Sequence, residues 1–171
     1  MSNLTVEAID SSSDDELFAL LGKELQTRIS AGRESPEFLT QVRKLPIGLR
    51  AMAVTYELDV SFALDDLGWH FGNWHNRELS EETARGLAEL GAAEVAAIFR
   101  EAYLVAQDYW TELGDKNWTK WYHGSPFERA VGPLDKRARA ILDQQGGNGI
   151  FKYWVDYARH YPERVGACEQ A

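Results

Sequence analysis

Apolar residues recur at helical spacing along most of this chain, and that periodicity constrains the fold more than any other feature. The clearest example follows a capping box formed by Ser13 and Glu16. Its apolar residues lie three or four positions apart, at Leu17, Leu20, Leu21, Leu25 and Ile29. Gly32 then marks a stop, so the sequence predicts a helix between Ser13 and Gly32.

The same signals predict further helices. One short helix starts at Ser35, and the others cover Pro46 to Leu64, Ser80 to Leu90, Val95 to Tyr109, Ser125 to Leu142 with an interruption near Gly132-Pro133, and Ile150 to Tyr161. Residues 65–76 break the periodicity and indicate a turn or a short distorted helix packed on the core. No strand-like alternation, repeat or linker is evident. We therefore predict an all-α fold, a single compact domain of about seven or eight helices over residues 13–165, with a flexible N-terminal tail at 1–12 and a C-terminal tail at 166–171.

The remaining composition narrows the class of protein. Cys168 is the only cysteine of the 171 residues, so no internal disulfide can form, and this fits a reducing compartment. The N-terminal residues do not resemble a signal peptide, and no run of apolar residues is long enough to span a membrane. We expect a cytoplasmic protein.

Negative charge is concentrated in the middle of the chain. Between Glu57 and Asp115 there are 13 acidic and 3 basic residues, a net charge of −10, while the whole chain carries −9. No lysine occurs between Lys44 and Lys116. Such a field attracts basic partners and repels nucleic acid and anionic membranes. The alternative is an acidic surface that serves only solubility.

Part of this charge repeats every seven residues, which keeps it on one face of a helix because seven residues advance about 10.5 Å and drift only about 20°. The predicted partner-binding residues are Glu78, Glu82, Glu89, Glu94, Glu101, Asp108, Glu112 and Asp115. Glu94, Glu101 and Asp108 form one stripe, and Glu82 and Glu89 form a second on the preceding helix. Duplex DNA carries one charge per about 1.7 Å of axis, so one stripe is too sparse to copy it, and two adjacent stripes come closer. The alternative is the plain polar face of an amphipathic helix.

Residues 54–103 resemble a family of small acidic bacterial proteins that form a domain of unknown function. The resemblance rests on Gly68-Trp69-His70-Phe71-Gly72-Asn73, on Leu90-Gly91-Ala92, and on an alanine-rich helix with Glu94, Ile98 and Glu101. One member of that family is a dimeric DNA mimic that occupies the DNA-binding surface of a transcription factor. The family often has Asn-Gly-Gly before the aromatic residues, where this chain has Asp66-Leu67-Gly68. The resemblance implies a DNA mimic and a possible homodimer.

Two other features suggest different chemistry. Asp65, Asp66, His70 and His75 could form a small catalytic or metal-binding cluster, although their spacing matches no zinc motif and a structural histidine is the alternative. Aromatic residues gather at Tyr109, Trp110, Trp118, Trp121 and Tyr122, beside Lys116 and Lys120. They suit a core, a dimer seam or a partner groove. They also resemble a nucleic-acid stacking platform, which the adjoining acidic field disfavours.

Three hypotheses follow. The first is a non-enzymatic acidic interaction protein that docks on a basic protein, which could be a DNA-binding protein whose DNA surface it occupies. The second is an immunity-type or antitoxin-type inhibitor of a basic protein. The third is a small enzyme that uses Asp65, Asp66, His70 and His75. We favour the first, and we expect no catalytic residue, cofactor, metal, nucleic-acid ligand or membrane partner.

Overall fold

The described part of the chain folds into helices alone. The computed structural model describes residues 4–145 and 149–167, and over these ranges it contains eleven α-helices, one closing 3₁₀ turn and no strand. The elements are α1 (Val6–Ser11), α2 (Asp14–Arg28), α3 (Glu37–Val42), α4 (Ile47–Leu64), α5 (Leu67–Asn73), α6 (Arg77–Glu89), α7 (Ala93–Asp108), α8 (Trp110–Leu113), α9 (Trp118–Tyr122), α10 (Pro126–Gln144), α11 (Phe151–His160) and η1 (Pro162–Val165). Seven of these described helices have seven or more residues, which confirms the predicted all-α domain.

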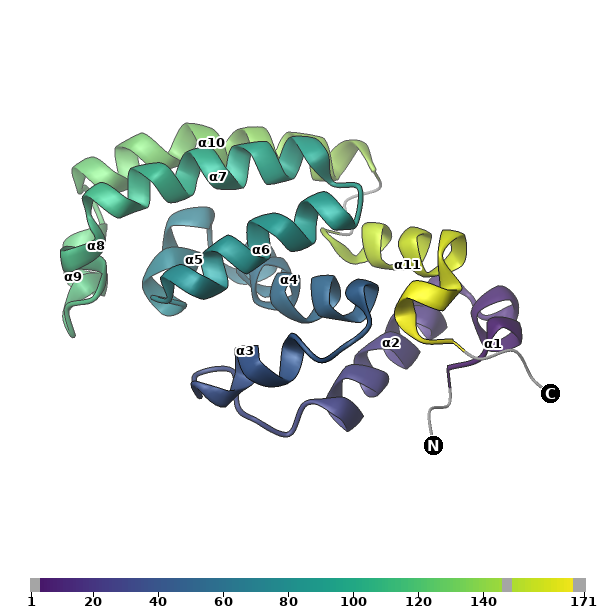
Figure 1. Cartoon of the computed structure of the whole chain (residues 1–171). Helices are drawn as coiled ribbons and strands as arrows, with labels where there is room; N and C mark the ends of the chain where they lie inside the picture. The colour runs from purple at the N-terminus through teal and green to yellow at the C-terminus, as the bar shows by residue number, and fades with distance from the viewer. Residues whose placement is uncertain (1–3, 146–148, 168–171) are drawn as a thin grey trace.

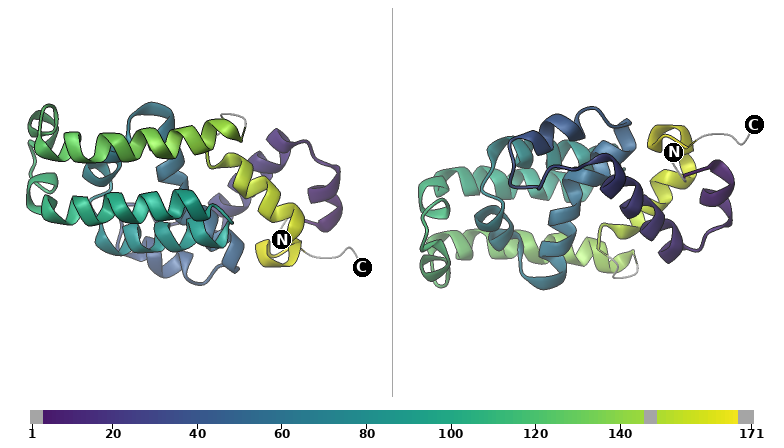
Figure 2. Two further views of the ribbon diagram at one scale, coloured as in Figure 1. Left: turned by 90° about the horizontal axis from the view of Figure 1, so that it is seen from above. Right: turned by 90° about the horizontal axis from the view of Figure 1, so that it is seen from below.

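The two long helices α7 and α10 lie side by side and run antiparallel, and they cover one side of α4, α5 and α6 (Figures 1 and 2). The short helices α8 and α9 connect them at one end of the molecule. Helices α1, α2 and α11 gather at the opposite end. The hairpin of α7 and α10 therefore carries the loop between its two long helices at an exposed tip.

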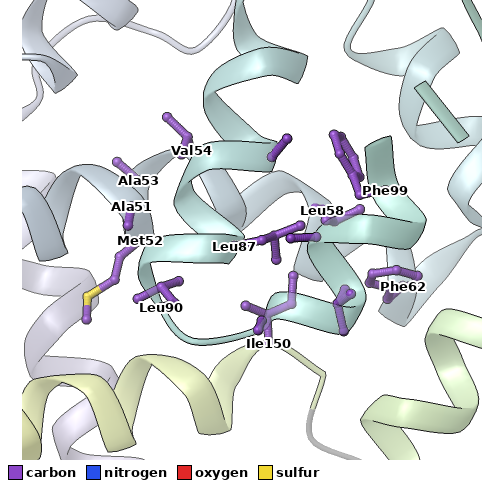
Figure 3. Packing of buried hydrophobic residues seen from close by; sticks show 14 of the residues in the cluster. Ala51, Met52, Ala53, Val54, Leu58, Phe62, Leu87, Leu90, Phe99 and Ile150 are labelled. Atoms are coloured by element: carbon purple, nitrogen blue, oxygen red, sulfur yellow. The ribbon is translucent and has the colours of Figure 1, made fainter. Parts of the chain in front are cut away.

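Helix α4 is the centre of the fold. Its buried residues include Leu49, Met52, Val54 and Leu58, which point in several directions around the helix axis. A helix that is apolar nearly all round needs neighbours on every side. Figure 3 shows Leu58 of α4 in the same buried cluster as Leu87 of α6 and Phe99 of α7. Among the described residues no helix combines the length and the apolar character needed to cross a membrane.

The flexible N-terminal tail predicted for residues 1–12 is wrong over the residues that the structure describes. Leu4 is 2% exposed and Ile9 is fully buried, and α1 packs on α11. Thr5 caps α1 by accepting a hydrogen bond from the Ala8 N–H at 3.1 Å. Burial of two large apolar side chains outweighs the polar composition around them. Of the predicted C-terminal tail, residues 168–171 lie outside the described residues, including Cys168.

The predicted interruption near Gly132-Pro133 is also wrong, because α10 continues from Pro126 to Gln144 with Pro133 inside it. Proline normally breaks a helix because it removes one backbone hydrogen bond and crowds the carbonyl four residues earlier. Here Pro133 and Arg129 are both exposed, so water can satisfy the carbonyl that loses its donor.

Candidate interaction site

The acidic segment takes its counter-charges from elsewhere in the sequence. Five of its carboxylates contact arginines that lie outside residues 57–115. The pairs are Glu57 with Arg33, Glu78 with Arg43, Glu82 with Arg43 and Arg50, Glu89 with Arg164, and Glu101 with Arg137. The net charge of −10 counted along the sequence is therefore partly neutralised in the fold.

Glu82 is the most strongly paired of these residues. Its side chain is 3% exposed, and its carboxylate lies 2.7 Å from Arg50, 3.1 Å from Arg43 and 3.2 Å from Arg85. Burial tends to raise the pKa of Glu82, but hydrogen bonds from Arg50 and Arg43 outweigh it and keep the pKa below its ordinary value. The prediction that Glu82 binds a partner is corrected, because a buried carboxylate with three arginine neighbours cannot face one.

Glu89 also faces inward. It accepts a hydrogen bond from the hydroxyl of Tyr157 and another from Arg164 at 2.9 Å. Burial and the contact with Glu89 raise the pKa of Tyr157 to about 12. The stripe of Glu82 and Glu89 therefore points towards α4, α11 and η1, and the two predicted stripes do not form one continuous acidic surface.

The stripe on α7 is on the outside of the molecule. Glu94, Glu101 and Asp108 are all exposed. The surface beside them is mixed in sign, since Arg137 of the neighbouring helix α10 lies 3.0 Å from Glu101. The exposure agrees with the sequence-based expectation, and the role in partner binding stays a prediction.

Reversing this stripe tests the surface assignment. We expect Glu94→Lys, Glu101→Lys and Asp108→Lys together to leave the fold intact, because exposed substitutions usually cost within about 0.5 kcal/mol each. Glu101→Lys should be the most costly, since it replaces the contact with Arg137 by a like-charge pair. Far-ultraviolet circular dichroism and a thermal melt measure the result. Glu82→Lys is the matched contrast and should unfold the protein, because it adds a buried cation among three arginines.

Two further predicted partner-binding residues, Glu112 and Asp115, lie at the tip formed by α8 and α9. A hollow of about 550 Å³ is lined there by Thr111, Glu112, Asp115, Asn117, Trp118, Lys120 and Trp121. Both tryptophans are half-buried, and Glu112 and Asp115 are exposed. Asp115 accepts a hydrogen bond from the Asn117 N–H at 2.7 Å, which holds the turn between α8 and α9.

Glycines on α5 position the aromatic side of this tip. A Cβ atom on Gly72 would lie 2.5 Å from the ring of Trp118, and one on Gly68 would lie 2.2 Å from the hydroxyl of Tyr122. Trp69, between the two glycines, meets Trp118 edge to face with ring centroids 4.7 Å apart. The glycine-aromatic motif at residues 68–73 therefore lies in a short helix, α5, on which α9 packs. A short helix was one of the two alternatives for this stretch, and a turn was the other.

This combination of groups suits a cationic side chain. Carboxylates attract a positive charge, and an indole face adds a cation–π interaction of about 0.5–2 kcal/mol, depending on how far the cation is desolvated. Lysine and arginine side chains also place their aliphatic stems against aromatic rings. The clustering of the aromatic residues is visible in the sequence, but only the fold shows that they share one hollow with Glu112 and Asp115.

The four residues of the enzyme hypothesis have separate structural roles. Asp66 caps α5 by accepting the Trp69 N–H at 2.9 Å, and it also accepts the Tyr122 hydroxyl at 2.7 Å. His70 is buried and contacts Ser61, whereas the Nε2 atom of His75 lies 2.8 Å from the carbonyl of Trp110. Asp65 is exposed. Within the described ranges, no group of three or more histidine, cysteine or acidic side chains is placed to hold a metal ion.

Comparison with family models, curated proteins and solved structures gave no match to this chain. The resemblance of residues 54–103 to the acidic bacterial family therefore stays a prediction. The fold and the tip define the class of protein only as a helical domain with a half-buried aromatic hollow flanked by carboxylates.

Proposed function

We propose that this protein is a non-enzymatic interaction protein that docks on a basic protein surface through the hollow at the α8–α9 tip. A lysine or arginine side chain of the partner enters the hollow, with its stem on Trp118 and Trp121 and its charge near Glu112 and Asp115. The observation that carries the proposal is the joint lining of one hollow of about 550 Å³ by these two indoles and two carboxylates, which outnumber the one lysine in the lining, Lys120.

The exposed stripe on α7 adds negative charge along the helix that leads to the tip. Glu94, Glu101 and Asp108 follow the hairpin towards the tip, and long-range attraction of this kind mainly accelerates encounter with a basic partner. Glu78, Glu89 and Glu101 contribute less than Glu94 and Asp108, because each pairs with an arginine of the protein itself. The exposed carboxylates on α7 are too sparse to match the phosphates of duplex DNA as closely as two adjacent stripes would. DNA mimicry is therefore a more specific form of the proposal, which competition by duplex DNA tests.

Binding of a fluorescent nona-arginine peptide tests the hollow. We expect Trp121→Ala to weaken binding about tenfold, which corresponds to the loss of about 1.4 kcal/mol of cation–π and packing energy. The double variant Glu112→Gln and Asp115→Asn should weaken it similarly while keeping the size of both side chains. Fluorescence anisotropy at low and high salt measures both effects, and binding should weaken with salt because both carboxylates are exposed.

The matched control is Asp143→Asn, which removes an exposed charge at the end of α10 that is distant in sequence from the tip. It should leave the affinity within about twofold, because screened surface charges contribute little individually. Equal affinity in the wild type and both tip variants would contradict the proposal. If the full chain binds a DNA-binding protein, competition by duplex DNA would then favour mimicry, and resistance to that competition would favour an inhibitor.

A further inference from the structure

A second cavity lies between α4 and α6. Its volume is about 230 Å³. The floor is apolar because Gly86 lets the two helices approach closely: a Cβ there would lie 2.7 Å from Val54 and 3.0 Å from the carbonyl oxygen of Ala51. Ile47, which is 50% exposed, stands at the rim.

The charge around this cavity is balanced, whereas the molecule as a whole is acidic. Arg50 and Arg85 line it, and Arg43 and Arg164 bind the two carboxylates that also line it, Glu82 and Glu89. Glu78 pairs with Arg43 and Glu81 with Arg85, so four guanidinium groups face four carboxylates. In a chain of net charge −9, this groove is therefore close to neutral, and it repels an anion less than the acidic surface does.

The arginines that line the cavity retain donors. A guanidinium group has five N–H donors. Among the described residues, the hydrogen bond from Arg50 comes from Nη2, to Glu82 at 2.7 Å. Arg85 donates from Nη1 to Glu82 at 3.2 Å and from Nη2 to Glu81 at 3.5 Å, both long contacts. Each side chain can therefore donate to a further acceptor in the cavity without breaking its bond to Glu82.

We propose that this cavity binds a small monocarboxylate that has an apolar body. The carboxylate accepts hydrogen bonds from Arg50 and Arg85, whose planar groups match carboxylate geometry. The apolar body lies on Ala51, Val54 and Gly86. A monoanion suits the site better than a phosphate dianion, because Glu82 and Glu89 line the same cavity. The ligand is small, since the volume is below the roughly 300–1,000 Å³ of cavities that hold drug-sized molecules.

Benzoate and its neutral isostere benzamide test the site by nuclear magnetic resonance. We expect benzoate to shift the Nε–H signals of Arg50 and Arg85 and the amide signal of Gly86 in the full-length protein. Benzamide should bind at least tenfold more weakly, because it lacks the charge that the arginines recognise. Phenyl phosphate, carrying a second negative charge, should also bind more weakly than benzoate.

Two exposed substitutions keep the test independent of folding. The side chain of Arg85 is 62% exposed, so Arg85→Gln should fold normally and weaken benzoate binding about tenfold. Ile47→Gln should weaken it less, because Ile47 reaches only the rim. Arg137→Gln on α10 is the control, because its contact lies with Glu101 on α7, and it should not change the affinity. Equal binding of benzoate and benzamide, or full benzoate affinity in Arg85→Gln, would overturn the proposal.

Discussion

Lowering the pH from 7 to 5 should reduce the free energy of unfolding by about 2 kcal/mol through His70 alone. The imidazole of His70 is 1% exposed and packs against the rings of Phe71 and Phe99, with centroids 5.6 Å away in each case. Burial lowers the pKa of His70 from 6.5 to about 3. In the unfolded chain His70 is protonated below about pH 6.5, whereas in the folded protein it stays neutral down to about pH 3. This contribution to stability is therefore complete above pH 6.5 and is lost progressively as the pH falls towards 3.

The neutral form is also the one that the hydrogen bonds favour. Ser61 donates its single hydroxyl proton to the carbonyl of Glu57 at 2.8 Å, so the Nδ1–H of His70 donates to the Ser61 oxygen at 3.1 Å. This network needs one proton on the ring and leaves no described acidic partner for a second. Protonation of His70 would bury a charge beside two phenylalanine rings.

Urea unfolding at pH 7, 6 and 5 measures the effect, and His70→Gln isolates it. The variant should be less stable at pH 7 because it loses ring packing, but its stability should depend less on pH by about 2 kcal/mol over this range. Comparison of the two slopes cancels other groups, including Asp59, whose pKa burial raises. His160→Gln is the matched control, since His160 is exposed and should leave the slope unchanged. A slope in His70→Gln as steep as in the wild type would show that His70 titrates normally.

The long helices were predictable because their signals are local. Ser13 and Glu16 form the expected capping box, and α4 ends at Leu64 as its spacing indicates. The predictions for residues 1–12 and for Gly132-Pro133 both failed because they depend on the tertiary environment. The polar stretch before Ser13 forms a helix because Ile9 is buried in the core. Helix α10 continues through Pro133 because Arg129, whose carbonyl loses its donor, is an exposed residue that water can reach. Neither environment can be read from neighbours in the sequence.

The site was less predictable than the fold, because its charges are paired across long sequence distances. Glu82 and Arg43 are 39 residues apart, and Glu89 and Arg164 are 75 apart. A seven-residue repeat places carboxylates on one face of a helix but does not say what that face meets. The spacing of Gly68 and Gly72 indicates close contact with another element as well as a turn. Two glycines four positions apart share one helix face, and glycine inside a helix is costly unless another element approaches closely.

That close approach makes Gly68→Ala and Gly72→Ala strongly destabilising. We expect each to cost about 1–3 kcal/mol, the usual range for overpacking a filled site. At Gly68 the new methyl group would lie 2.2 Å from the hydroxyl of Tyr122, which is 1% exposed and donates a hydrogen bond to Asp66. At Gly72 it would lie 2.5 Å from the ring of Trp118. Urea unfolding measures the loss, and tryptophan fluorescence of the folded protein should change because Trp118 must move against Trp69.

The matched control is the same substitution at Gly22, inside α2. A Cβ there meets nothing within 4 Å, and the backbone does not adopt positive φ. Gly22→Ala should therefore stabilise the protein by about 0.5–1 kcal/mol, because alanine has the higher helix propensity and restricts the unfolded chain. The opposite signs at chemically identical substitutions would attribute the cost on α5 to contact with α9. If Gly68→Ala and Gly72→Ala were as stable as Gly22→Ala, then α9 would not pack on α5. The hollow at the tip would lose its structural support, since Trp118 is held there by this contact.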